Sequence, residues 1–295
     1  MPSKSDFMVQ RGYEVIADHL SGFAVPRGSP EDLKRYHMAA HKAFYCRFSS
    51  IDYVLKTYGS SWDFSRDHPE VYGLLFEGTS KIRVNVDAIV RKGHGLIDLP
   101  NHLGLVMAQS ALQRAQSSFK AACLLCEAEM GFEVFCVAKL ILEQIAWAYA
   151  IHKIDDNSLY RVKPCACISH LKSLFPNVGR MYGYMNEQSH MDPKVIHGFL
   201  KVEDENFIVV LRDVNKCLLG CLGLLYLADM YGTCTEIVYG PWCKEFVFIT
   251  KKKSGIKLKP HRKSQTEIED FDTRVFDYLQ RTTDKTTKDP TSQGP

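Results

Sequence analysis

The sequence lacks any uninterrupted apolar run of about 18 residues, the length at which a segment is read as a membrane-spanning helix. Its nearest approach, Cys217 to Met230, is shorter than a membrane span and includes Asp229. The first residues, Met1 to Phe7, lack the apolar core of a secretory signal. These absences predict a cytoplasmic protein without a membrane partner.

The chain also lacks a strong excess of either charge. Its 37 Lys and Arg residues nearly balance 34 Asp and Glu residues, which leaves a net charge of +3. That balance is too small to indicate nucleic-acid binding by the chain as a whole. With 45% hydrophobic and 24% charged residues, the composition is that of a globular protein. The 295 residues suffice for one large domain, or for a core with appended segments.

Cysteine is present, but not in the setting of a disulfide framework. The ten cysteines belong to a long chain without an export signal. Cys123 and Cys126, joined with Cys165 and Cys167, would offer four thiolates to a structural zinc ion. Leu124 and Leu125 continue a helical pattern between the first pair, which favours thiols packed as small apolar side chains. We therefore predict no cofactor and no metal ion.

Two long helical patterns dominate the centre of the chain, at 108–129 and 133–153, and only Met130 to Phe132 separates them. A connection this short predicts antiparallel packing at the middle of a helical bundle. The second pattern places apolar residues along one side of a helix. These residues are Val134, Val137, Ala138, Ile141, Leu142, Ile145, Ala148 and Tyr149.

The flanking segments predict further helices and little strand. We expect helices at 5–20, from Pro30 to Tyr58, at 164–175, 176–188 and 213–232, and over the acidic stretch 267–281. Residues 80–90 fit either a helix or a strand. A small hairpin is expected between 237 and 250, and disorder over 282–295.

These elements predict a mainly all-α fold, a helical bundle with N-terminal helices and a small β or irregular appendage near the C-terminus. The expected divisions are an N-terminal helical segment at 1–100, a central bundle at 101–235, a short β and basic segment at 236–264, and a short helix with a disordered tail at 265–295.

One group of polar residues has the composition of a site. Lys139 and Glu143 are four apart, so they share a helix face, and a polar stretch ends at His190. If that stretch folds onto the helix, His190 and Glu143 can form a hydrogen bond that orients the imidazole ring. His190 would then act as general acid or base, Glu143 would orient it, and Lys139 would contact an anion. The predicted cluster comprises Lys139, Glu143, Tyr184, Asn186, Glu187 and His190.

Two other interpretations of this cluster remain open. In the first, Glu143 and His190 form a buried polar contact that only ties a loop to the bundle. In the second, Glu143, Glu187, His190 and Asp192 hold a metal ion, although nothing in their spacing requires it.

The segment from Lys139 to Tyr149, followed by Tyr-x-x-Met-Asn-Glu-x-x-His190, resembles a signature of an uncharacterised bacterial family in the HEPN-like superfamily. Glu143 and His190 match the pattern of that family. Lys139 stands where arginine is usual, and Asn186 where serine is usual. The resemblance covers about 103–231. It implies an all-helical fold, and several such relatives are metal-independent ribonucleases of toxin–antitoxin or phage-defence systems, whereas others only bind.

The remaining signals lie outside this region. Arg35-x5-His41 satisfies the loose ribonuclease pattern of HEPN relatives, but chance matches to so short a pattern are expected. His37 lies one turn from His41, which is the spacing of two imidazoles on one metal ion, but ordinary histidines are the favoured interpretation. Residues 251–263 hold seven Lys or Arg and no acid, which indicates either a phosphate-binding surface through Lys251, Lys252 and Lys253 or a solvated linker.

The resemblance implies a HEPN-like helical protein of a bacterial stress, toxin–antitoxin or antiviral defence module, and the polar residues predict that it acts through a pocket around Glu143 and His190. The alternatives are a ribonuclease effector that uses His190, and a non-catalytic module that binds RNA, DNA or a protein. A homo-oligomer is also expected, because helices this apolar form either a core or a dimer face.

Overall fold

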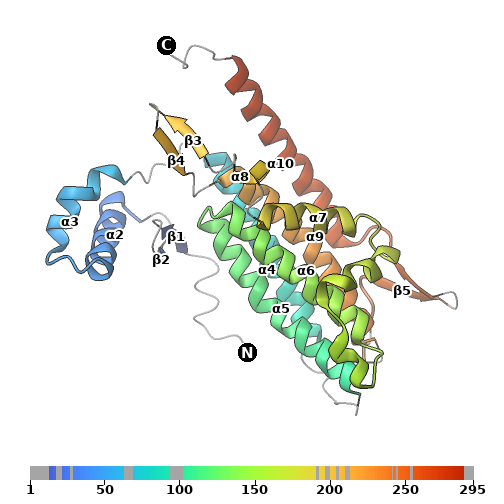
Figure 1. Cartoon of the computed structure of the whole chain (residues 1–295). Helices are drawn as coiled ribbons and strands as arrows, with labels where there is room; N and C mark the ends of the chain where they lie inside the picture. The colour runs from blue at the N-terminus through green and yellow to red at the C-terminus, as the bar shows by residue number, and fades with distance from the viewer. Residues whose placement is uncertain are drawn as a thin grey trace. The chain divides into compact units, whose positions relative to one another are not determined.

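A computed structural model describes residues 13–17, 22–26, 29–62, 69–93, 102–190, 193–196, 200–203, 206–209, 213–240, 242–243, 245–252 and 255–288. The chain forms two compact units, Met1–Gly73 and Leu74–Pro295. Helices make up most of the described residues, and the strands form three separate two-stranded antiparallel hairpins (Figure 1). The predicted fold class, mainly all-α, is therefore confirmed.

The first unit combines one hairpin with short helices. Its hairpin pairs β1 (Tyr13–Ala17) with β2 (Gly22–Pro26), so the predicted helix at 5–20 is wrong over these residues. Ile16 and Val25 are buried with Met38, and Trp62 packs against them. Val15 and Ile16 are β-branched residues that favour strands, and pairing with the second strand supports extended backbone over helix here.

The predicted helix from Pro30 to Tyr58 is divided in two. The structure has α2 (Glu31–Tyr45), α3 (Ile51–Tyr58) and a single 3-10 turn, η1 (Gly59–Ser61). Arg47 adopts a left-handed conformation with φ of 54°, and this conformation interrupts the helical path. Ser50 then caps α3 by accepting a hydrogen bond from the Tyr53 N–H at 3.3 Å.

The second unit is a bundle built on four long helices. They are α4 (Pro69–Gly93), whose first turn belongs to the first unit, α5 (Leu103–Glu127), α6 (Gly131–Ile151) and α9 (Val214–Val238). The helices α5 and α6 lie side by side, as predicted for the central pair (Figure 1). At their turn, the Asp213 N–H donates to the carbonyl of Glu129 at 2.9 Å, so the start of α9 is held against the α5–α6 connection.

The remaining elements are short, except for the 26-residue helix α10. They are η2 (Asn157–Arg161), η3 (Pro164–Ser173), α7 (Val178–Ser189), α8 (Pro193–Ile196), β3 (Leu200–Glu203), β4 (Asn206–Val209), β5 (Ile249–Lys252), β6 (Gly255–Leu258) and α10 (Lys263–Lys288).

Three of the predicted C-terminal boundaries differ from the structure. The helix expected to end near 232 continues to Val238, and the hairpin expected between 237 and 250 is formed at 249–258. The final helix runs from 263 to 288 rather than from 267 to 281, so disorder at 282–288 is wrong. Residues 289–295 lie outside the described residues.

The helix α9 is the most enclosed element of the bundle. Its residues from Leu227 to Val238 are all buried, including Asp229 and Glu236. Gly220 permits close packing with α6, because a Cβ atom there would lie 2.6 Å from Cγ1 of Val134. Among the described residues, α6 and α9 have the length and composition of membrane spans, with 56% and 78% of the tested windows buried. The core helices of a bundle satisfy the same criteria, so the cytoplasmic location stays a prediction.

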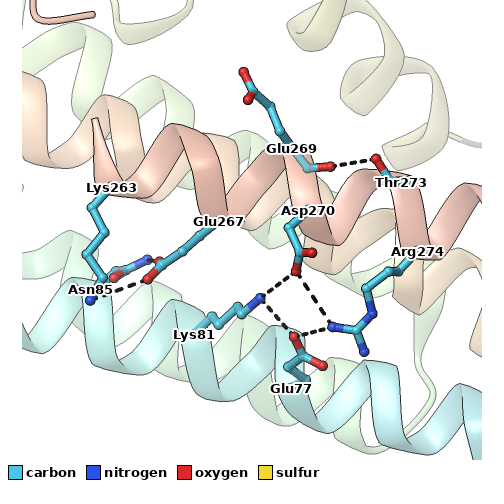
Figure 2. Close-up of polar contacts among 9 residues, drawn as sticks. All are labelled: Glu77, Lys81, Asn85, Lys263, Glu267, Glu269, Asp270, Thr273 and Arg274. Carbon is cyan, nitrogen blue, oxygen red and sulfur yellow. Dashed lines mark hydrogen bonds and ion pairs between the residues drawn. The ribbon is translucent and has the colours of Figure 1, made fainter. Parts of the chain in front are cut away.

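The helix α10 contacts α4 through an ionic network (Figure 2) and through one buried aromatic ring. Phe271 is buried over Gly78, where an added Cβ would lie 2.7 Å from the ring. Beside it, Glu77 forms ion pairs with Lys81 and Arg274, at 2.8 and 2.7 Å. Burial acts to raise the pKa of Glu77, but its hydrogen bonds to Arg274 and Lys81 outweigh burial and lower the pKa.

Candidate functional site

The structure pairs Glu143 with Tyr182 rather than with His190. On α6, Glu143 accepts a hydrogen bond from the Tyr182 hydroxyl of α7 at 2.8 Å. Burial and the neighbouring Glu143 carboxylate raise the pKa of Tyr182 to about 12, so this hydroxyl remains a donor at neutral pH. Lys139 lies one turn away, with its Nζ atom 5.8 Å from the centre of the Tyr182 ring.

His190 lies at the end of α7 and is exposed. Its Nε2 atom is 3.1 Å from Oδ1 of Asn186, one turn earlier on the same helix. Eight residues separate His190 from Tyr182, which corresponds to about 12 Å along a helix. The predicted hydrogen bond between Glu143 and His190 is not formed, because the α7 register places Tyr182 beside Glu143.

The other members of the predicted cluster diverge on the surface of α7. Glu187 is exposed, and the ring of Tyr184 packs edge-on against Phe135 at 5.3 Å between centroids. Burial, together with the carboxylates of Asp213 and Glu187, raises the pKa of Tyr184. Lys139 and Glu143 therefore share a location with Tyr182, while Tyr184, Asn186, Glu187 and His190 do not converge on them. Asp192 lies outside the described residues.

The basic stretch is folded rather than linear. Lys251 and Lys252 are exposed on β5, and Lys253 lies outside the described residues. The Nζ atom of Lys251 lies 4.5 Å from the centre of the Phe246 ring. Lys259 donates to the carbonyl of Phe246, and Arg262 pairs with Asp229. At least two cations of this stretch thus stabilise the fold instead of facing solvent.

The cysteines predicted to be core thiols pack between α5 and α9. Cys123, Cys126, Cys217 and Cys221 are all buried and free of disulfides. Burial raises the pKa of the Cys123 thiol. Burial and a hydrogen bond to Cys221 both raise the pKa of the Cys126 thiol. Cys165 is exposed on η3, at a different location. Among the residues that the structure describes, no three His, Cys, Asp or Glu side chains are placed to hold a metal ion.

The described part of the chain has a groove of about 670 Å³. Its walls come from the η3–α7 connection, α7, α9, the end of β6 and the start of α10. Pockets for small molecules commonly have volumes of about 300–1,000 Å³. Most of the lining side chains are apolar, among them Leu174, Phe175, Met181, Leu219, Leu222 and Ile268.

The α9 wall of the groove follows one face of the helix. Leu219, Leu222, Tyr226 and Met230 recur at intervals of three or four residues, which places them in a row along the groove. Leu219 and Leu222 are half-buried, and Tyr226 is 41% exposed. Burial raises the pKa of Tyr226, as do the carboxylates of Asp272 and Glu269. The hydroxyl of Tyr226 is therefore protonated and able to donate a hydrogen bond.

A buried ion pair forms part of the groove lining. Arg262 binds Asp229 through two parallel hydrogen bonds, from Nε to Oδ1 at 2.9 Å and from Nη2 to Oδ2 at 2.7 Å. Ser264 adds a third hydrogen bond to Oδ1 at 2.6 Å. The two charged side chains are 9% and 6% exposed, so the pair is almost fully removed from bulk solvent.

The groove lining is balanced in charge. Arg180 on α7 and Arg262 are cationic, whereas Asp229 and Glu269 are anionic. Arg180 is exposed at the α7 side, and Glu269 accepts a hydrogen bond from Nε2 of Gln265 at 2.9 Å. The lining therefore carries no net charge, which favours a ligand that carries none.

Searches with this chain found no matching family model, no matching curated protein and no matching solved structure. The geometry of the groove is therefore the main structural basis for assigning a function. The HEPN-like kinship stays a prediction.

The groove was missed because its lining comes from segments far apart in the sequence. Of the predicted site residues, Tyr184 lines it. The row of apolar residues on α9 was visible in the sequence, but the same spacing also describes a helix packed in a core. The pairing of Asp229 with Arg262 spans 33 residues and leaves no local pattern.

Proposed function

We propose that this protein is a non-catalytic binding module that takes up an apolar small molecule in the groove between α7, α9 and α10. The observation that supports the proposal most directly is the groove of about 670 Å³ with its largely apolar lining. Removing apolar surface from water contributes about 25 cal/mol per Å², so side chains such as Leu219 and Leu222 supply the main driving force.

N-phenylnaphthylamine serves as the probe that tests this proposal, because it is uncharged and its fluorescence increases in apolar surroundings. Leu222→Asp places a charge in the groove wall, and we expect it to weaken binding by at least about tenfold, because burying a carboxylate beside an apolar ligand is costly. The measurement is a fluorescence titration of wild type and variant at equal protein concentration, with circular dichroism to confirm that both are folded.

The matched control is Leu140→Asp, because Leu140 is 41% exposed on α6 and is not part of the groove. This variant should bind the probe as wild type does. Equal binding by wild type and Leu222→Asp, or no saturable binding by wild type, would contradict the proposal.

The predicted ribonuclease function is separable from this proposal. If His190 is a general acid or base, wild type cleaves a fluorescent RNA with and without chelator, and His190→Ala abolishes cleavage. Because His190 is exposed, the substitution should change the free energy of unfolding by less than about 0.5 kcal/mol, so lost activity would not reflect lost folding. RNA left intact by folded wild type, alongside probe binding, would support the binding module.

A further inference from the structure

We infer that the groove recognises an uncharged ligand that carries a carbonyl-type oxygen, and that this oxygen accepts a hydrogen bond from Arg262. The inference rests on the proposed binding function and names the chemical class of its ligand. It depends on the buried ion pair rather than on the apolar walls.

Arg262 has donor capacity beyond its described partners. A guanidinium group carries five N–H donors. In the described part of the chain, Nε donates to Asp229 Oδ1, Nη2 to Asp229 Oδ2, and Nη1 to the carbonyl of Lys259 at 2.8 Å. One N–H on each of Nη1 and Nη2 therefore has no acceptor among the described residues. The Arg262 side chain is 9% exposed and lines the groove, so a ligand in the groove can approach the guanidinium group.

The charge of the ion pair selects an uncharged acceptor. A carboxylate ligand near Arg262 would also approach Asp229, whose oxygens lie 2.7 and 2.9 Å from the guanidinium nitrogens. Attraction by one partner and repulsion by the other largely cancel, while the desolvation of the ligand charge remains. A carbonyl oxygen loses little hydration and gains a hydrogen bond from a charged donor, the stronger kind in proteins.

Two probes that share the same aromatic ring system, and differ only in a carbonyl group, test this inference. Prodan, a propionyl-dimethylaminonaphthalene, presents a carbonyl, and its propyl analogue does not. The measured quantity is the ratio of the two dissociation constants, analogue over Prodan. We expect this ratio to be about tenfold larger for wild type than for the double variant Asp229→Leu, Arg262→Met, which replaces the ion pair by apolar side chains.

A spectroscopic measurement on wild type does not depend on the folding of that variant. The infrared carbonyl stretch of bound Prodan should lie below its frequency in hexane, because a donated hydrogen bond weakens the C=O bond. A stretch equal to that in hexane would overturn the inference. The inference would also be overturned if Tyr226→Phe removes the preference for Prodan and the double variant does not, because the hydrogen-bond donor would then be Tyr226.

The outcomes distinguish this inference from the proposed function. If both probes bind in the groove with a ratio that the double variant leaves unchanged, the groove binds apolar molecules and the role of Arg262 is refuted. If neither probe binds wild type, the proposed function and the inference fall together.

Discussion

Glu236→Gln should lower the free energy of unfolding by about 3 kcal/mol, because it removes a buried charge that holds three backbone N–H groups. Glu236 is 5% exposed on α9, and its carboxylate accepts hydrogen bonds from the N–H groups of Val247, Phe248 and Ile249. The latter two measure 2.8 and 3.1 Å. An amide in this position offers one oxygen and directs its own N–H donors at backbone donors.

The measurement is urea unfolding followed by circular dichroism. Glu245→Gln is the matched control, since Glu245 is exposed in the segment just before these residues, and it should change the free energy of unfolding by less than about 0.5 kcal/mol. A Glu236→Gln protein as stable as the control would show that the three N–H groups find other acceptors.

Breaking the ion pair between Asp229 and Arg262 should have an effect of similar size. We expect Arg262→Ala to lower the free energy of unfolding by about 3–5 kcal/mol, because Asp229 remains buried without its cation. The loss arises from the uncompensated carboxylate rather than from the net contribution of the pair. Ser264 continues to donate to Asp229, but one hydroxyl does not replace a bidentate guanidinium.

The double variant Asp229→Leu, Arg262→Met provides the contrast. Replacing a buried ion pair by apolar residues of similar size is often neutral or stabilising. We therefore expect it to recover at least half of the stability lost in Arg262→Ala. A double variant less stable than Arg262→Ala would mean that the pair is favourable in itself, beyond the cost of leaving one charge alone.

Both predictions concern the same structural feature. Asp229 and Glu236 are seven residues apart, which places them two turns apart on one side of α9. Asp229 holds the residue preceding α10, and Glu236 holds the residues entering β5. Since Leu258, Arg262 and Gln265 line the groove, these two buried carboxylates also position its C-terminal wall.

The sequence predicted best where the signal was local. The central helices were found because Ile141, Leu142 and Ile145 repeat at helical spacing, and each of them is fully buried. Elements in the first unit were predicted poorly. A moderately amphipathic stretch around Ile16 is strand rather than helix, because strand pairing supplies contacts that no single segment reveals.

The contacts of the predicted cluster around Glu143 depended on tertiary packing. Glu143 was correctly placed on the face of α6, but its partner depends on how α7 lies across that helix. Tyr182, Asn186 and His190 are spaced four apart on α7, so each stood one turn from the next, and only packing determined which one meets Glu143.

By itself the sequence determined the helical class and the long apolar helices, because the period of apolar residues is a local property of the chain. Only the tertiary structure decided that Asp229 meets Arg262, that Glu236 meets the start of β5, and that apolar faces of α7, α9 and α10 enclose a groove. These contacts join residues distant in the chain, so their energies depend on packing and burial that no local pattern contains.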